Sequence, residues 1–161
     1  MEIREFAESD WPQVWAIYRV VVDAGETYTY DPGWTERQAH DVWVEPEPGR
    51  TFVAVEGDRI VGTAHVGPNK PGRGAHVATA SFMVDASTRG LGVGRALGEY
   101  VLAAARADGY SSMQFNAVVE ANTGAVRLWQ QLGFEIIGTV PEAFDHPSQG
   151  LVGLHIMYRA L

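Results

Sequence analysis

The stretch VDASTRGLGVGRAL, residues 84–97, sets three glycines and two arginines between an apolar run typical of a strand and an apolar run typical of a helix. Glycines let a ligand approach the main chain without meeting a Cβ atom. At the start of a helix they leave N–H groups unpaired at the positive end of the helix dipole. Such a helix start binds anions, most often phosphate, and Arg89 and Arg95 can add charge-assisted hydrogen bonds. A glycine-rich helix start without a ligand is the alternative.

The spacing of these glycines excludes two common nucleotide motifs. It is not G-x-x-x-x-G-K-[ST], so a nucleoside triphosphate loop is not expected. It is not G-x-G-x-x-G either, because Arg95 or Leu97 stands where the third glycine belongs. The stretch also follows the fourth predicted strand, whereas the dinucleotide motif opens its βαβ unit.

The order of apolar patterns around this stretch predicts an α+β fold. The pattern favours a mixed, mostly antiparallel sheet of about seven strands with helices on both faces. The predicted elements are strands at 2–6, 50–56, 59–69, 75–84, 111–119, 134–140 and 151–160, and helices at 11–24, 35–44, 91–109 and 121–133.

Composition limits the class of protein. At 161 residues, 46% of them hydrophobic, the chain is expected to form a single domain over residues 1–161. A formal net charge of −8 argues against nucleic acid as the main partner. There is no apolar run long enough for a membrane span and no apolar core of a signal peptide, so we expect a cytoplasmic protein that does not bind membranes. With no cysteine and no metal-ligand spacing among the five histidines, we expect neither disulfides nor a metal.

A family resemblance gives these patterns a function. The run R-x-x-G-x-G, at Arg89, Gly92 and Gly94, resembles the pyrophosphate-binding motif of GCN5-related N-acetyltransferases. The segments ASFMV before it and ANTGAVRLWQQLGFEIIG after it resemble other motifs of that family, in the same order, over nearly the whole chain. Ala86 departs from the family, which often has proline there. The resemblance implies acetyl-CoA as co-substrate, held in a splay between the fourth and fifth strands.

The resemblance also implies which residues hold acetyl-CoA. The main chain of Phe82, Met83 and Val84 would hold the pantetheine arm and the thioester carbonyl. Asn122 would bond the pantetheine region, and its position also predicts a helix N-cap. The pyrophosphate would meet the amides of Arg89, Gly90, Leu91, Gly92, Val93, Gly94 and Arg95.

Acid and base are harder to assign. Many family members have a tyrosine as acid where this chain has Trp129, whose indole donates a hydrogen bond but is not a usable acid. Because no Ser/His/Asp-type nucleophile arrangement stands out in the sequence, we expect the acceptor amine to attack the thioester directly. His65 and His155 lie in predicted strands and are expected to be core or face residues. Carboxylates beside turns are usually solvated or capping groups, which is the alternative for each base candidate: Glu26, Asp23, Asp85, Glu120 and His76.

A narrower resemblance concerns the acceptor. DAGETYTYD and FNAVVEANTGAVRLWQQLGF resemble stretches of fungal acetyltransferases that act on azetidine-2-carboxylate and related proline analogues. Asn116 and Asn122 match two asparagines with binding roles in that group, whereas Thr79 stands where those enzymes have a further asparagine. The resemblance implies a small-molecule amine acceptor of the amino-acid or proline-analogue class.

Three residues are the candidates for lining the acceptor pocket. Tyr28 and Tyr30 would line it from a loop, or pack on the core as a lid. Asn116, a polar residue in an apolar strand, would bind an amino-acid carboxylate or a neighbouring main-chain group. No catalytic residue is assigned from the sequence, and Asn116 and Glu26 are the candidates for that role.

Other functions and assemblies remain open from the sequence. The acceptor could instead be a herbicide-like amino acid or an antibiotic amine, and the chain could be a non-catalytic module that binds acyl-CoA. Dimers are frequent in such families, and the C-terminal strands could supply a homodimer interface.

Overall fold

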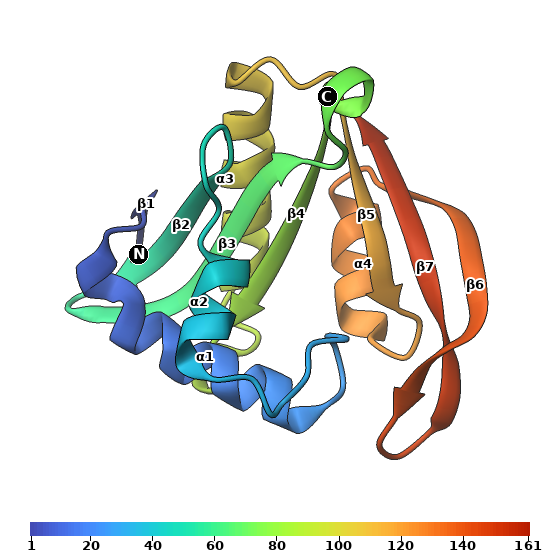
Figure 1. Cartoon of the computed structure of the whole chain (residues 1–161), viewed down its shortest axis with the longest axis horizontal. Coiled ribbons are helices and arrows are strands. Elements are labelled where there is room, and N and C mark those ends of the chain that lie inside the picture. Colours follow the sequence, from blue (N-terminus) through green and yellow to red (C-terminus); the bar gives the residue numbers. More distant parts are fainter.

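A seven-stranded sheet in the order β1-β2-β3-β4-β5-β7-β6 organises the chain in the computed structural model, which describes residues 1–161 (Figure 1). All neighbouring strands are antiparallel except β4 and β5, which confirms the predicted mixed sheet. The strands are β1 (Glu2–Glu5), β2 (Arg50–Glu56), β3 (Arg59–Pro68), β4 (Val77–Val84), β5 (Ser112–Val119), β6 (Glu135–His146) and β7 (Gly150–Ala160), and the helices are α1 (Trp11–Ala24), α2 (Glu36–Trp43), α3 (Val93–Ala107) and α4 (Thr123–Gln131).

The main difference from the predicted elements is the length of β6, which extends well past residue 140. Pro141 and Glu142 resemble a turn in sequence, and Glu142 does have a positive φ of 51°. The structure forms a bulge there instead, and pairing with β7 resumes at Phe144.

Each face of the sheet is covered by two helices, as predicted. The core under α3 and α4 includes Leu97, Val101 and Met113, and the core under α1 and α2 includes Val14 and Trp43. These side chains are completely or almost completely buried, and the burial of each contributes about 1.5–3 kcal/mol. None of these helices combines the length and the hydrophobicity that a membrane span requires.

The parallel pair β4 and β5 separates soon after it forms. Pairing is limited to Val77 with Ser112 and Ala78 with Met113, and the strands then diverge toward their C-terminal ends (Figure 1). On its other edge β4 stays paired with β3 as far as Val84. One edge of β4 therefore has main-chain groups without a strand partner in the middle of the sheet.

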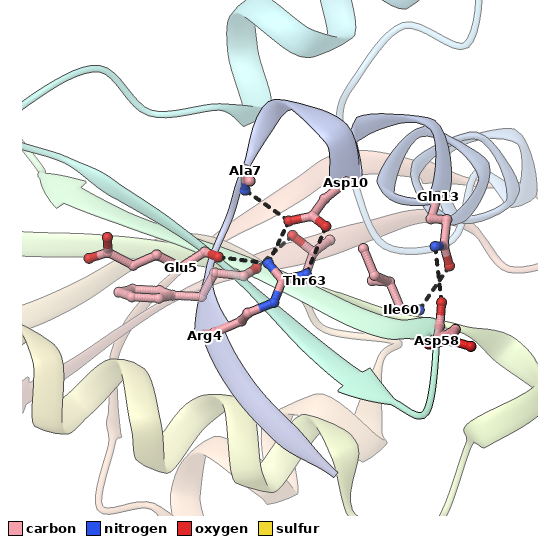
Figure 2. Close-up of polar contacts among 9 residues, drawn as sticks. Arg4, Glu5, Ala7, Asp10, Gln13, Asp58, Ile60 and Thr63 are labelled. Carbon is pink, nitrogen blue, oxygen red and sulfur yellow. Dashed lines mark hydrogen bonds and ion pairs between the residues drawn. The ribbon is translucent and has the colours of Figure 1, made fainter.

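Side-chain bonds fix α1 against the sheet (Figure 2). Arg4 donates to both carboxylate oxygens of Asp10 at 2.7 and 2.8 Å. These bonds lower the pKa of Asp10 and outweigh the opposing effect of burial. Gln13 accepts from the Ile60 amide at 2.9 Å and donates to the Asp58 carbonyl at 3.2 Å. Helix α1 is thereby held so that its last turn faces the gap between β4 and β5.

Candidate active site

A cleft of about 450 Å³ occupies the gap between β4 and β5. Its walls come from the last turn of α1, the loop that follows it, the diverging halves of β4 and β5, and one face of α4. Predicted site residues that line it are Glu26, Tyr28, Tyr30, Phe82, Met83, Val84, Asp85, Arg89, Gly94, Asn116, Asn122 and Trp129.

The main chain of Phe82 faces this cleft. Residues of an antiparallel pair alternate between bonding their partner strand and facing away from it. The Tyr28 hydroxyl donates to the Phe82 carbonyl at 2.6 Å and accepts from the Phe82 amide at 2.9 Å, so both groups point away from β3. By the same alternation Val84 also faces the cleft, whereas the main chain of Met83 bonds β3.

The loop after α1 forms an aromatic wall. The Tyr28 ring stacks on Tyr30 at 5.2 Å, and Tyr30 stacks on Tyr18 at 5.8 Å. The two predicted roles of the loop tyrosines are therefore combined, because Tyr28 and Tyr30 line the cleft and also pack on the core. Burial raises the pKa of both residues, so their hydroxyls stay protonated and act as hydrogen-bonding groups rather than bases.

The glycine-rich turn before α3 presents free amides beside one end of the cleft. Gly90 and Gly92 have φ values of 84° and 85°, which L side chains rarely adopt. The Arg89 and Leu91 amides are not free, because they donate to the Ala86 and Thr88 carbonyls at 3.3 and 3.1 Å. The amides that donate to no protein group are those of Gly90, Gly92, Val93, Gly94 and Arg95. This arrangement at a helix N-terminus suits an anion.

The two arginines of this turn differ in their surroundings. Arg89 is exposed, lines the cleft and makes no ion pair or side-chain hydrogen bond. Arg95 donates to Gln131 on α4 and lies 3.7 Å from Glu99. Only Arg89 therefore has a free guanidinium at the cleft.

Helix α4 supplies a cap and an apolar floor. Asn122 accepts from the Ala125 amide at 3.3 Å, which confirms the predicted N-cap, and it also lines the cleft. Trp129 is buried against Phe82 and Phe115, with ring centroids 4.7 and 4.9 Å apart. At the position of the family's tyrosine, the chain therefore has a packed apolar ring.

Two of the base candidates are tied to the protein itself. Burial would raise the pKa of Asp85, but hydrogen bonds from the Ser87 amide at 2.8 Å and Arg59 at 2.5 Å lower it overall. Glu120 accepts from the Gly153 amide at 2.9 Å. Asp85 therefore caps the turn that follows β4, and Glu120 is bonded to the main chain of β7.

The other three base candidates differ in position. Asp23 and His76 are exposed and do not line the cleft. Glu26 is exposed on the loop after α1 and lines the cleft without a partner. Among the five candidates, Glu26 alone is an unengaged carboxylate at the cleft.

Asn116 belongs to a group of side-chain amides. It lies in a bulge of β5, donates to Asn69 Oδ1 at 2.7 Å and accepts from Gln114 at 2.9 Å. Its partners within the protein are therefore side-chain amides and not the main-chain group that was the alternative to a substrate carboxylate. No local sequence pattern indicates Asn69 as a site residue, because the loop before β4 reaches β5 only through tertiary packing.

Comparisons with known proteins agree with this geometry. The model of the acetyltransferase (GNAT) family matches residues 2–134. The N-acetyltransferase aca1 of Schizosaccharomyces pombe is 28% identical over 137 residues, 76% of this chain and 66% of that protein. A structure of a GCN5-related N-acetyltransferase from Kribbella flavida is 53% identical, with a TM-score of 0.97 over 99% of this chain and 97% of that one.

A more distant structure shares the fold. A phosphinothricin acetyltransferase from Sinorhizobium meliloti in complex with AcCoA has a TM-score of 0.90 at 20% identity, over 99% of this chain and 88% of that one. The chain spans 66%, 15% and 44% of the lengths of three curated relatives. The family match and the separation of β4 from β5 together show that the chain belongs to the acetyltransferase (GNAT) family.

Proposed function

We propose that this protein is an acetyl-CoA-dependent N-acetyltransferase that acts on a small-molecule amine, with an amino acid or proline analogue as the acceptor class. The observation that carries the proposal is the separation of β4 from β5. It opens one cleft that runs from the free amides before α3 to the aromatic wall after α1. The AcCoA named with the Sinorhizobium enzyme of the same fold supports the choice of donor.

The residues of the cleft fit acetyl-CoA, which would supply an acetyl group activated as a thioester. The five free amides before α3 and the Arg89 guanidinium suit its diphosphate. The main-chain groups of Val84 suit the amides of the pantetheine arm, whereas those of Phe82 are occupied by the Tyr28 hydroxyl, and Asn122 lies beside the same path. The ring of Trp129 gives this path an apolar floor that excludes water.

The other side of the cleft suits the acceptor. Glu26 would attract the protonated form of an amine, and the stacked rings of Tyr28 and Tyr30 would contact its apolar part. The amide group of Asn116 and its neighbours offers neutral N–H donors to a carboxylate. Because no side chain of the cleft forms a nucleophile–base pair, the amine attacks the donor directly. A homodimer and a cytoplasmic location stay predictions of the sequence.

The test is a panel of amines assayed by thiol release from acetyl-CoA. The panel contains azetidine-2-carboxylate, a phosphinothricin-type amino acid, an aminoglycoside and a peptide with a free N-terminus. Turnover with an amino acid supports the full proposal, and turnover with the aminoglycoside alone moves the acceptor to the antibiotic amines. Binding of acetyl-CoA without turnover on any amine would contradict catalysis and favour a non-catalytic binding module.

A further inference from the structure

His65 on β3 is a buried histidine with unusual surroundings. Its side chain is 8% exposed and lies edge-on to Trp43, with ring centroids 4.7 Å apart. Nδ1 is 2.8 Å from Glu45 Oε1, out of line for a hydrogen bond, and Nε2 has no partner. Burying a polar group without a hydrogen-bond partner costs free energy of folding. A functional role would explain why the chain keeps a histidine at this position.

Glu45 is held beside His65 by the segment after α2. The Glu45 amide donates to Thr51 Oγ1 at 3.0 Å. Its second carboxylate oxygen lies over Gly67, where an added Cβ would come within 3.2 Å. The Glu45 side chain is 25% exposed and lines a separate open hollow of about 780 Å³ on the side of β2. The carboxylate thus connects the buried ring to solvent.

Ser81 connects His65 to the cleft. The two residues are direct partners across β3 and β4, so their side chains share one face, with Cβ atoms about 5 Å apart. Ser81 lines the cleft, and its hydrogen bond partly offsets the rise that burial causes in the pKa of Tyr30. Ser81 therefore places a cleft-lining hydroxyl at the position paired with His65, without a hydrogen bond to Nε2, and Glu45 lies beside the other ring nitrogen.

We propose that His65, held by Glu45, takes up the proton of the acceptor amine through the Ser81 hydroxyl and releases it to the hollow at Glu45; this rests on the proposed function. As the nitrogen–carbon bond forms and the carbon–sulfur bond breaks, the electron pair leaves with sulfur and the amine must lose one proton. The carboxylate favours the tautomer with hydrogen on Nδ1, which leaves Nε2 as the acceptor. Because His65 acts through Ser81, it is a positioning residue.

Few ionisable groups face His65 from the elements that pack against it. From the segment after α2 it meets the Glu45 carboxylate. Tyr18 of α1 and Tyr28 pack on the Trp43 ring that His65 contacts, and burial raises the pKa of both, so they stay protonated. The neighbouring strands supply only hydroxyls, those of Thr51 on β2 and Ser81 on β4.

The experiment compares His65→Gln, Glu45→Gln and His155→Gln with the wild type in the thiol-release assay from about pH 5 to pH 9. His155 is the matched control, because it lies on β7, contacts Thr139 at 2.7 Å and does not line the cleft. Calorimetry with acetyl-CoA and a melting curve accompany each variant. We expect His65→Gln to lower kcat about 100-fold, with loss of the fall in rate on the acid side and no change in acetyl-CoA affinity.

The outcomes separate this relay from the proposed function. A wild type without turnover on any amine overturns the proposed function, and the relay with it. An active wild type whose pH profile His65→Gln leaves unchanged overturns the relay alone, as does an equal effect of His155→Gln. If His65→Gln does not fold, the partly exposed Glu45→Gln decides: a kcat lowered about 10-fold at unchanged acetyl-CoA affinity supports the relay, and an unchanged kcat overturns it.

Discussion

Replacing Arg89 and Arg95 one at a time tests whether the two arginines contribute differently to acetyl-CoA binding, although the sequence motif assigns both to the same anion site. Arg89 has a free guanidinium at the cleft, whereas that of Arg95 is bonded to Gln131 and lies near Glu99. A hydrogen bond to a charged group is worth about 1.5–3 kcal/mol, and solvent screening at this exposed site reduces it to about 1–2 kcal/mol. Arg89→Ala should therefore weaken acetyl-CoA binding about 5- to 30-fold.

The assay is calorimetric titration with acetyl-CoA at low and high salt. The effect of Arg89→Ala should shrink at high salt, because mobile ions screen an exposed charge pair. Arg95→Ala should change the affinity little at either salt concentration, which makes it the matched control. An equal loss in both variants, or no loss for Arg89→Ala at low salt, would refute the assignment of Arg89 to the diphosphate.

Three further predictions concern stability. Asp10→Asn should lower the free energy of unfolding by about 2 kcal/mol at pH 7. Because the pKa of Asp10 is lowered in the folded protein, the wild type loses this advantage as the pH falls below about 4. Urea denaturation of both proteins at several pH values across that range checks the prediction. Gly98→Ala places a Cβ atom 2.7 Å from Leu132 and should destabilise the fold by about 1–3 kcal/mol. Gly124→Ala, where the added Cβ on α4 meets open space, should stabilise the fold by about 0.5–1 kcal/mol. Equal melting temperatures of the two variants would contradict this. Tyr28→Phe leaves two main-chain groups on β4 unpaired and should cost about 1–3 kcal/mol in urea titrations, and a neutral change would show that water replaces the hydroxyl.

The fold could be predicted largely from the sequence, because periodicity and helix-ending signals are local. Gly25 ends α1 with a φ of 67°, and Thr35 caps α2 by accepting from the Gln38 amide at 3.3 Å, as their residue types indicate. The course of β6 was not predictable in this way. Its bulge at residues 141–143 depends on pairing with β7, and Pro141 by itself reads as the end of a strand.

The candidate site was predictable only in part, for a related reason. Motif residues such as Gly94 and Asn122 lie at the cleft because each stands near the start of the helix that follows a cleft strand, α3 after β4 and α4 after β5. The contact of Tyr28 with Phe82 joins residues 54 positions apart, and no local pattern encodes it. His65 reads as an ordinary core residue, because its neighbours Glu45 and Ser81 come from two other segments.

Binding of acetyl-CoA to the wild type and to the pair Gly92→Asp and Gly92→Asn tests the central claim most directly. Aspartate and asparagine have nearly the same shape, and both tolerate the left-handed conformation that Gly92 adopts, so the pair differs mainly in charge. We predict measurable binding to the wild type, a modest loss for Gly92→Asn, and a further loss of about 2 kcal/mol, roughly 30-fold, for Gly92→Asp. No binding to the wild type, or equal affinities of the two variants, would contradict an anion site at the start of α3.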